Sequence, residues 1–415
     1  MSLIFVQSNS YQETIDWLFK QFPSYQLIGE KAYKPTLDNC RKLSDLFNNP
    51  DNGLKLIHVA GTNGKGSTSA MLSSILTENG FKVGLFSSPH IHDFRERIRI
   101  NGEMINEEEV VNFCSTIKTL DIDFSPSFFE ITWILALKHF QFNQCDYCII
   151  ETGLGGRLDA TNIITPILSV ITNIGLEHTN FLGTTLTEIA FEKAGIIKRK
   201  IPVVIGETTP ETKKVFQEIS EERNASIYFS ENYSVSKPNN FPFIADYQVM
   251  NFRTVQTALR VFEKIEKITI EDDSIEKGLK ALTKNTGFYG RLQKVNDRPL
   301  TFIDVSHNVD GIKATIQSIK KINKGKLHLI YGTSNDKDLE QIFTLFGKDN
   351  LYYFTEFSNE RSAKIEKLET YSTKFKLKAN FFENINSAYS NAQVFANEND
   401  TILIFGSFFL LSDFI

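Results

Sequence analysis

Short hydrophobic runs alternate with longer stretches of mixed polar and apolar residues over most of this 415-residue chain. Five of the runs are apolar on both faces, which predicts buried β-strands at 54–60, 83–87, 145–151, 167–172 and 203–206. The stretches between them are amphipathic and predict helices that follow Gly64, Asn106, Phe128 and Leu186. Such strands, separated by helices, favour a mostly parallel sheet covered on both sides, so we expect an α/β fold.

The alternation pauses near residue 288 and then begins again. Helical patterns at 247–264 and 273–283 precede a segment rich in turn formers, 284–299. Beyond it, four strand-like runs alternate with helical stretches: TFIDVS, KLHLIYG, LYYFTE and TILIFGS. We therefore expect a larger α/β domain at 1–288, a linker at 289–298 and a smaller α/β domain at 299–415.

The composition and net charge of the chain argue against several classes of binding partner. The net charge of −5 gives no overall positive field for binding nucleic acid or an anionic membrane. No apolar stretch reaches the length of a membrane span, and the start of the chain has no basic segment typical of an export signal. Four cysteines fit a reducing cytoplasm. Cys145 and Cys148 form a C-x-x-C within a predicted strand, where an odd offset predicts opposite faces and strand packing rather than a metal site.

The strongest motif is Gly61-Thr62-Asn63-Gly64-Lys65-Gly66-Ser67, between a predicted strand and a predicted helix. Glycines let the backbone curl so that N–H groups and the helix N-terminus face a phosphate. Lys65 adds a positive charge, and a hydroxyl can bind Mg²⁺. In the generic P-loop, Lys immediately precedes Ser or Thr, whereas Gly66 intervenes here. The sequence therefore predicts a variant loop that holds a triphosphate.

Polar motifs also follow the other predicted strands. Ser88 lies in SSPH, which alone is more typical of a turn. Glu151 begins ETGLGGRLDATN, and a carboxylate at the end of a buried strand needs a cation, for which Mg²⁺ is the natural candidate. Alone, His178 in GLEH is more typical of a structural histidine, and Lys193 in EKAG of a solvated helix residue. Arg291, which lies in the expected linker, and polar residues at strand ends of the second domain fit structure and function equally well.

Taken in order, the motifs resemble those of folylpolyglutamate synthases and dihydrofolate synthases, within the Mur ligase superfamily, over essentially the whole chain: GTNGKGS, SSPH, ERIRING, SFFE, ETGLGGRLDATN, IGLEHTNFLG, EKAGI, DVSHN and DKD. The resemblance implies an ATP-dependent ligase with a larger P-loop ATPase domain and a smaller Rossmann-like domain. Its substrates would be ATP, L-glutamate and dihydropteroate or folate. Transfer of the γ-phosphoryl group would turn the pterin carboxylate into an acyl phosphate, which an amine can attack.

The resemblance also implies roles by position. Nucleotide binding falls to Asn63, Gly64, Lys65, Gly66, Ser67, Asn251, Arg291 and Asp304. Mg²⁺ ligands would be Ser88, Glu151 and His178, and a carbamylated Lys193 would help to bind a second Mg²⁺. The pterin substrate would lie against Ser127, Phe128, Phe129, Arg157, Leu158 and Asp159. Lys65, Lys193 and His307 are the candidate catalytic residues, and His307 and Ser407 would lie near glutamate or ATP.

Alternatives remain for several of these assignments. Phe128 and Phe129 also fit core residues that open a helix. The GGRLDATN form favours dihydrofolate synthase activity, with polyglutamylation as a second role. A cell-wall Mur ligase would carry a nucleotide-sugar-binding domain before the phosphate loop, which here begins at Gly61. A P-loop ATPase or regulatory protein without ligase activity would need no amino-acid pocket. We expect a cytoplasmic monomer acting on small molecules.

Overall fold

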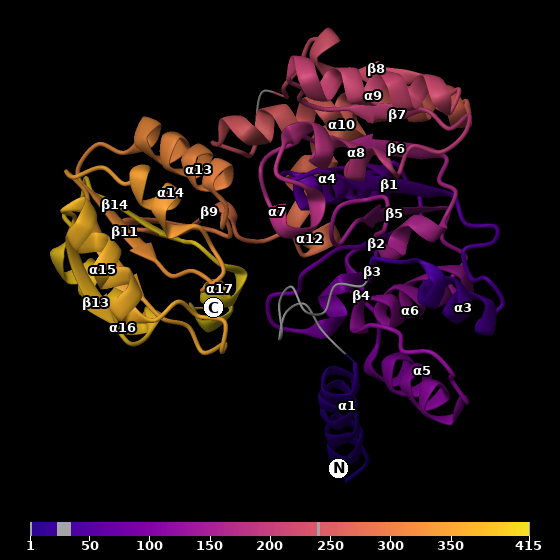
Figure 1. The fold of residues 1–415 in the computed structure, drawn as a ribbon, viewed down its shortest axis with the longest axis horizontal. Coiled ribbons are helices and arrows are strands. Elements are labelled where there is room, and N and C mark those ends of the chain that lie inside the picture. Colours follow the sequence, from indigo (N-terminus) through magenta and orange to yellow (C-terminus); the bar gives the residue numbers. More distant parts are fainter. Residues whose placement is uncertain (1, 23–34, 239–240, 415) are drawn as a thin grey trace. The chain divides into compact units, whose positions relative to one another are not determined.

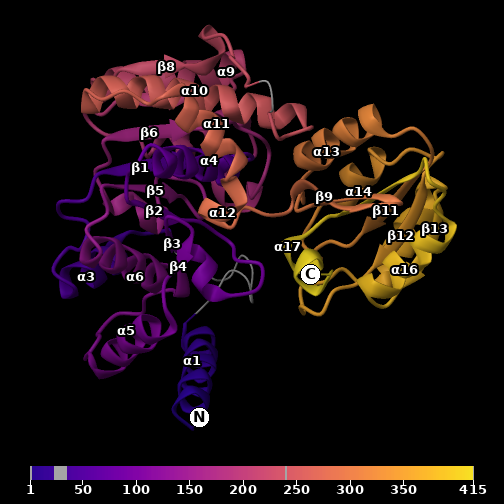
Figure 2. The same cartoon turned by 180° about the vertical axis from the view of Figure 1, so that it is seen from behind.

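The computed structural model describes residues 2–22, 35–238 and 241–414. The chain divides into two compact units, one made of residues 1–242 and 249–288 and the other of 243–248 and 289–415. The first unit contains an eight-stranded sheet and the second a six-stranded sheet (Figures 1 and 2). Helices cover both sheets, so the predicted α/β class is confirmed.

The sheet of the first unit has the order β4-β3-β2-β5-β1-β6-β7-β8. It is parallel except at one edge, where β3 and β4 form an antiparallel hairpin beside β2. Each strand predicted for this part of the chain contains an observed one. The strands are β1 Leu56–Ala60, β2 Val83–Phe86, β3 Ile98–Ile100, β4 Glu103–Met104, β5 Tyr147–Glu151, β6 Leu168–Ile171, β7 Val203–Ile205 and β8 Ile227–Phe229.

Side-chain caps fix the start of several helices in this unit. Asn106 caps α5, and Ser127 and Thr185 form capping boxes with Glu130 and Glu188 at the starts of α6 and α8. The helices are α1 Ser2–Gln21, α3 Asp38–Leu46, α4 Lys65–Glu78, α5 Glu107–Thr119, α6 Phe128–Phe142, α7 Thr179–Leu182, α8 Leu186–Ala194, α9 Pro210–Glu222, α10 Asp246–Glu266, α11 Asp272–Lys280 and α12 Leu282–Thr286, with 3₁₀ turns η2 Phe94–Arg97, η3 Ala160–Ile163 and η4 Ser230–Asn232.

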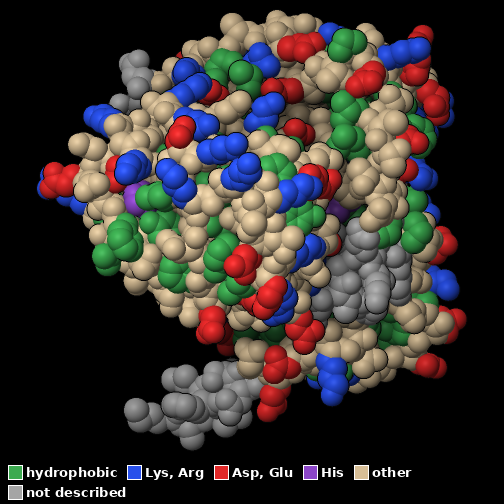
Figure 3. All heavy atoms as spheres, turned by 60° about the vertical axis from the view of Figure 1, so that its left-hand side comes forward, with side chains coloured by type: hydrophobic (Ala, Val, Ile, Leu, Met, Phe, Trp, Pro, Cys, Tyr) green, Lys and Arg blue, Asp and Glu red, His purple; other side chains and the backbone are tan. Residues whose placement is uncertain are grey.

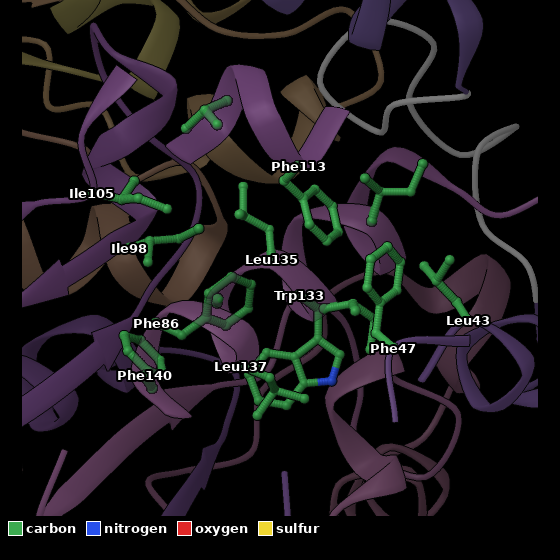
Figure 4. Packing of buried hydrophobic residues seen from close by; sticks show 14 of the residues in the cluster. Leu43, Phe47, Phe86, Ile98, Ile105, Phe113, Trp133, Leu135, Leu137 and Phe140 are labelled. Carbon is green, nitrogen blue, oxygen red and sulfur yellow. The ribbon is translucent and has the colours of Figure 1, made fainter. Parts of the chain in front are cut away.

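Alternating residues of the central strands face two different layers. In β5, Cys148 and Ile150 belong to a core that includes α3, α5 and α6. Figure 4 shows its aromatic centre, where the rings of Phe86 and Trp133 lie 5.1 Å apart. Helix α4 packs on β1, β2 and β5, with α11 against it. Because both faces are covered, the strands are apolar throughout, as the sequence pattern predicts.

The sheet of the second unit has the order β13-β12-β11-β14-β10-β9 and is parallel except for β9. Helices α13, α14 and α15 supply residues to the core on one face, and α16 and α17 supply residues to the core on the other. The elements are β9 Arg291–Asp297, β10 Leu300–Asp304, α13 Val309–Ile322, β11 Leu327–Tyr331, α14 Leu339–Thr344, β12 Leu351–Thr355, α15 Ile365–Phe375, β13 Lys378–Phe382, α16 Ile385–Phe395, β14 Thr401–Phe405 and α17 Phe408–Phe414.

Three details of the sequence interpretation are wrong. Most of the stretch predicted as a linker forms β9, an edge strand paired antiparallel with β10. Strand β13 was not predicted, because its residues are half-buried or exposed and include Lys378 and Asn380, which weakens the hydrophobic signal. Cys145 precedes β5, where strand alternation does not apply, and it belongs to the same hydrophobic core as Cys148 instead of facing the opposite side of the sheet.

Two surface properties bear on the partners expected from composition. Figure 3 shows Lys and Arg side chains interspersed with Asp and Glu side chains on the face that it displays. Among the described residues, no helix combines the length and apolar character needed to cross a bilayer.

Candidate active site

Four of the sequence motifs lie at the carboxyl ends of four adjacent strands. Strands β2, β5, β1 and β6 are neighbours and run parallel. They lead into SSPH, ETGLGG, the phosphate loop and the segment 173–178, respectively. Parallel strands place their carboxyl ends at one edge of a sheet, where ligands of α/β proteins bind. The fold therefore gathers these motifs at a single edge of the first unit.

The phosphate loop leads directly into α4, which begins at Lys65. Gly64 occupies the N-cap position with φ of 85°, a left-handed conformation that glycine adopts without strain. A Cβ placed on Gly64 would lie 2.2 Å from Asn251 Oδ1, so a side chain does not fit there. The structure thus brings Asn251, a predicted nucleotide contact, against the loop. The N–H groups at the start of α4 are suited to an anion.

Two lysines donate to the same carbonyl oxygen of the phosphate loop. Lys65 Nζ lies 3.0 Å and Lys193 Nζ 2.8 Å from Gly61 O. Burial, with a smaller contribution from the positive charge of Lys65, lowers the pKa of Lys193 to about 7. Lys193 is therefore a buried amine whose uncharged form is populated near neutral pH, and not a solvated helix residue.

Glu151 and Ser88 come together where β5 and β2 end. The backbone N–H of Ser88 donates to Glu151 Oε2 at 3.2 Å, and the Glu151 side chain is buried. The neighbouring Thr152 hydroxyl is buried and has no hydrogen-bond partner within the described ranges. Carboxylate and hydroxyl oxygens are the donors that Mg²⁺ prefers, so this group of residues fits that ion.

His178 lies in the segment that follows β6. It occupies the N-cap position of α7 with φ of 52°, and its Nε2 is 3.9 Å from Glu177 Oε1. No group of three or more His, Cys, Asp or Glu side chains suited to a metal occurs in the part of the chain that the structure describes. Mg²⁺ commonly uses one or two carboxylates and takes its other ligands from water and substrate phosphates. The role of His178 as a ligand stays a prediction.

The Asp159 side chain forms hydrogen bonds with the backbone of the loop that follows β5. Its carboxylate accepts hydrogen bonds from Leu154 N at 2.7 Å and from Thr161 N at 3.0 Å, and it is buried. Burial raises the pKa of Asp159, and these hydrogen bonds oppose the rise. Arg157 pairs with Glu192 at 2.7 Å. Asp159 therefore shapes the loop, while Arg157 is exposed beside the half-buried Leu158.

The residues Ser127, Phe128 and Phe129 have different surroundings. Ser127 accepts a hydrogen bond from Glu130 N at the start of α6. Phe128 is 2% exposed and stacks on Phe19 with ring centres 4.5 Å apart, so it is a core residue. Phe129 is half-buried, and a Cβ placed on Gly153 would lie 2.7 Å from its ring. The ring of Phe129 therefore lies against the loop after β5.

The candidate residues of the second unit gather where β10 and β14 end. Asp304 is buried and accepts hydrogen bonds from Tyr247 Oη at 2.9 Å and Leu292 N at 2.7 Å. Arg291 lies over the ring of Phe408, 5.1 Å from its centre. His307 Nδ1 lies 2.9 Å from Val305 O, to which it donates. Ser407 Oγ accepts from Phe409 N at 3.1 Å.

Two groups of residues near the motifs were given no role from sequence. Arg97 is buried, and its Nε donates to His90 Nδ1 at 2.8 Å. Burial lowers the pKa of Arg97 to about 10, and the charges of Glu96 and Glu151 oppose that effect. Asn173 contacts the phosphate loop directly. His90 and Arg97 lie in the motifs SSPH and ERIRING, and Asn173 directly precedes the motif IGLEHTNFLG, so these positions were the available signal.

Comparisons with known proteins agree over nearly the whole chain. Residues 59–271 match the Mur ligase middle domain, and residues 290–408 match the Mur ligase glutamate ligase domain. A Bacillus subtilis protein named dihydrofolate synthase/folylpolyglutamate synthase is 30% identical, with 97% of this chain and 98% of that protein covered.

Solved structures with similar folds carry ligands. Escherichia coli FolC in complex with DHPP and ADP has a TM-score of 0.82 and 28% identity, covering 97% of this chain and 96% of that one. A bifunctional folylpolyglutamate synthase/dihydrofolate synthase from Yersinia pestis, complexed with AMPPNP and Mn, has a TM-score of 0.79 and 27% identity, covering 92% and 93%. Each holds an adenine nucleotide.

Proposed function

The chain belongs to the dihydrofolate synthase/folylpolyglutamate synthase family of Mur ligases, and we propose that it adds L-glutamate to dihydropteroate and to folates. It is an ATP-dependent carbon–nitrogen ligase. The matching glutamate ligase domain and the names of the relatives favour this function over a cell-wall ligase or an ATPase without ligase activity. The observation that carries the proposal is the phosphate loop with Lys65 at the same sheet edge as Glu151.

The reaction has two steps: transfer of a phosphoryl group to a carboxylate, and attack of an amine on the acyl phosphate that results. An oxygen of the carboxylate of dihydropteroate or folate attacks the γ-phosphorus of ATP, the bond to the β-phosphate oxygen breaks, and ADP leaves. The amine of glutamate then attacks the acyl carbon, inorganic phosphate leaves, and the amine gives up a proton as the amide forms. Negative charge grows on phosphate oxygens in the first step, so stabilising it is the main task of the protein.

The first unit carries groups for that task. The N–H groups at the start of α4 bind phosphate oxygens, and Lys65 exchanges its contacts with the loop carbonyls for the phosphates. Ser88, Glu151 and Thr152 would hold Mg²⁺, with His178 as a further ligand. When bound, Mg²⁺ neutralises phosphate charge and raises the electrophilicity of the γ-phosphorus. The half-buried ring of Phe129 offers a face for the flat pterin.

The second unit carries groups for glutamate. His307 Nδ1–H donates to Val305 O, which orients the ring. We assign the other ring nitrogen, Nε2, to the proton that leaves the attacking amine. Arg291 and Ser407 would bind carboxylates or phosphate, while Asp304 positions the backbone around them through its hydrogen bonds.

Lys193 is proposed to react with CO₂ and become a carbamate that helps to hold a second Mg²⁺. A carbamate forms only from an uncharged amine, and the pKa of Lys193 near 7 makes that form available. Protein exchanged into ¹³C-bicarbonate should show a carbamate carbon signal by NMR that is missing in Lys193→Arg. A spectrum without such a signal, at millimolar bicarbonate, would remove the carbamate from the proposal.

The direct test uses purified protein with ATP, Mg²⁺, dihydropteroate and L-glutamate. ADP release that requires both other substrates, and dihydrofolate identified by mass spectrometry, would support the ligase. ATP turnover that ignores them would favour the plain ATPase. Substituting tetrahydrofolate for dihydropteroate tests polyglutamylation in the same assay.

We further propose that the protein is cytoplasmic, which its four free thiols fit. We also propose that it is a monomer, and light scattering would test this by measuring its mass.

A further inference from the structure

The loop that follows β2 begins with Ser87 and Ser88, and its later residues bind one carboxylate. Glu96 Oε2 accepts from Ile91 N at 2.8 Å, and Glu96 Oε1 accepts from the backbone N–H groups of the next two residues, His92 and Asp93, each at 2.9 Å. Three consecutive N–H groups therefore meet a single side chain. Hydrogen bonds to a charged acceptor are stronger than those between neutral groups, so Glu96 fixes the path of this part of the loop.

Arg97 holds the earlier part of the same loop. Its carbonyl oxygen accepts from Ser87 N at 3.1 Å, and its Nε donates to His90 Nδ1 at 2.8 Å. Ser88 lies between these two contacts and donates its own N–H to Glu151 Oε2. The neighbouring residues 96 and 97 thus bind the loop before and after Ser88, and the position of Ser88 depends on both.

The element that carries Glu96 is itself anchored in the first unit. The turn η2 contains Phe94, which is 3% exposed and belongs to the same core as Phe86. Directly after η2, Ile98 of β3 pairs with Phe86 of β2. Because η2 is held by the core and by the sheet, the Glu96 carboxylate is a fixed point to which the loop is bound.

We infer that Glu96 is a positioning residue that orders the loop after β2, so that Ser88 is placed to hold Mg²⁺ together with Glu151. The inference rests on the proposed function, which assigns the metal to these two residues. Both carboxylate oxygens of Glu96 accept from the loop backbone, so Glu96 acts through that backbone and is not itself a metal ligand. Loss of Glu96 should weaken metal-dependent nucleotide binding and leave metal-free nucleotide binding unchanged.

Two substitutions remove different parts of the contact. Glu96→Ala removes the acceptors of all three N–H groups. Glu96→Gln keeps one acceptor oxygen and replaces the other with an amide nitrogen, which is a donor and cannot accept from the loop. The effect should therefore be graded, with Glu96→Ala the larger. Glu96→Gln also keeps the size of the side chain, so it tests the inference even if the alanine variant folds poorly.

Glu263→Ala is the matched control. Glu263 is also a carboxylate that accepts from a loop backbone, since its Oε1 binds Ile270 N at 2.8 Å. It lies near the end of α10, where Glu266 accepts from Tyr147 Oη at the start of β5. The motifs lie at the carboxyl ends of the strands, so this control lies toward the opposite edge of the sheet. Like Glu96→Ala, it removes one negative charge and an acceptor for the backbone.

Binding is measured by calorimetry: the Kd for ADP without divalent metal, and the Kd for AMPPNP with and without Mg²⁺. Initial rates give the Mg²⁺ concentration for half-maximal turnover, and urea unfolding gives stability. In Glu96→Ala, we expect Mg²⁺ to tighten AMPPNP binding about 10-fold less than in the wild type, and half-maximal turnover to need about 10-fold more Mg²⁺. Glu96→Gln should show changes of about threefold. Metal-free ADP binding, and every property of Glu263→Ala except stability, should stay within about twofold of the wild type.

Three results would overturn the inference. One is a wild-type Mg²⁺ effect in both Glu96 variants, alone or with a lower urea midpoint, which would assign a purely structural role. Another is an equal loss of metal-free ADP affinity, which would assign a general disturbance of the site. The third is wild-type protein that binds AMPPNP equally with and without Mg²⁺. If the wild type binds AMPPNP more tightly with Mg²⁺ but makes no amide, the proposed ligase function fails while the binding series still tests Glu96.

Discussion

Burial changes the chemistry of individual side chains that look ordinary in the sequence. Lys193 and Phe128 are examples: the first lies on an amphipathic helix and is 4% exposed, and the second was expected against the substrate and is 2% exposed. The motif around each residue was visible, but its surroundings depend on which distant segments pack against it. Lys193 meets Gly61, more than a hundred positions away. Single-sequence patterns do not contain that information.

Lys193 should make stability depend on pH in a defined direction. Its pKa is about 7 in the folded protein against a usual 10.5, so between these values the unfolded chain binds more protons. Unfolding free energy should therefore rise with pH in this range, by up to about 1.4 kcal/mol per pH unit, while the full cost persists below pH 7. Urea unfolding of metal-free protein without CO₂, from pH 7 to 9, measures it. Lys193→Met should remove this rise, and equal slopes in both proteins would contradict the burial argument.

Glu151→Gln tests the proposed metal site by replacing one carboxylate oxygen with an amide nitrogen. The amide keeps the size of the side chain and can still accept from Ser88 N, so the fold should persist. Loss of the negative charge should lower turnover at limiting Mg²⁺ by about 100-fold. Initial rates over a Mg²⁺ titration, with circular dichroism as the folding control, give the answer. Near-normal rates at low Mg²⁺ would remove Glu151 from the site.

Phe128 and Phe129 should separate stability from substrate binding. Phe128→Leu leaves space in the core around Phe19 and should cost about 1–2 kcal/mol of stability with little change in KM for dihydropteroate. Phe129→Leu should raise that KM by about 2- to 10-fold with a smaller effect on stability, because the stacking face is lost. Urea unfolding and steady-state kinetics on both variants suffice. The reverse pattern would exchange the two assignments.

At the level of elements, the sequence predicted buried strands well and edge strands poorly. Strands β1, β2, β5, β6 and β7 each lie between two other strands of a sheet that helices cover. Continuous apolar runs therefore mark them in the sequence. Strands β9 and β13 lie at the two edges of their sheet, where polar residues remain in contact with water and the pattern is lost. The phosphate loop was predictable because its glycines, lysine and following helix are all local in sequence.

Gly64→Ala tests why the junction of loop and helix needs glycine. Alanine at φ of 85° costs about 1–2 kcal/mol, and here its Cβ would also meet Asn251. Gly53→Ala is a matched control, since Gly53 has the same φ with nothing within 4 Å of a Cβ. We expect Gly53→Ala to show the conformational cost alone and Gly64→Ala to lose, in addition, at least about 10-fold in ADP affinity. Equal behaviour in unfolding and calorimetry would contradict the close packing at Gly64.

For the whole molecule, strand order in the sheet explains why scattered motifs act together. The four motifs follow four predicted strands along the chain, but only the strand order β2-β5-β1-β6 shows that these strands are adjacent. This order joins residues 61–67 with residues 151–157 and 172–178 at one edge. Hydrophobic periodicity predicts which segments are strands, whereas strand pairing depends on contacts between segments far apart in sequence. Periodicity therefore could not predict the strand order.

The central claim is that the protein activates a carboxylate by phosphorylation before the amide bond forms. Dihydropteroate labelled with ¹⁸O in its carboxyl group, incubated with ATP, Mg²⁺ and L-glutamate, tests it by mass spectrometry of the inorganic phosphate. The account predicts one ¹⁸O atom transferred to phosphate for each amide formed from fully labelled acid. Amide formation with unlabelled phosphate would contradict it.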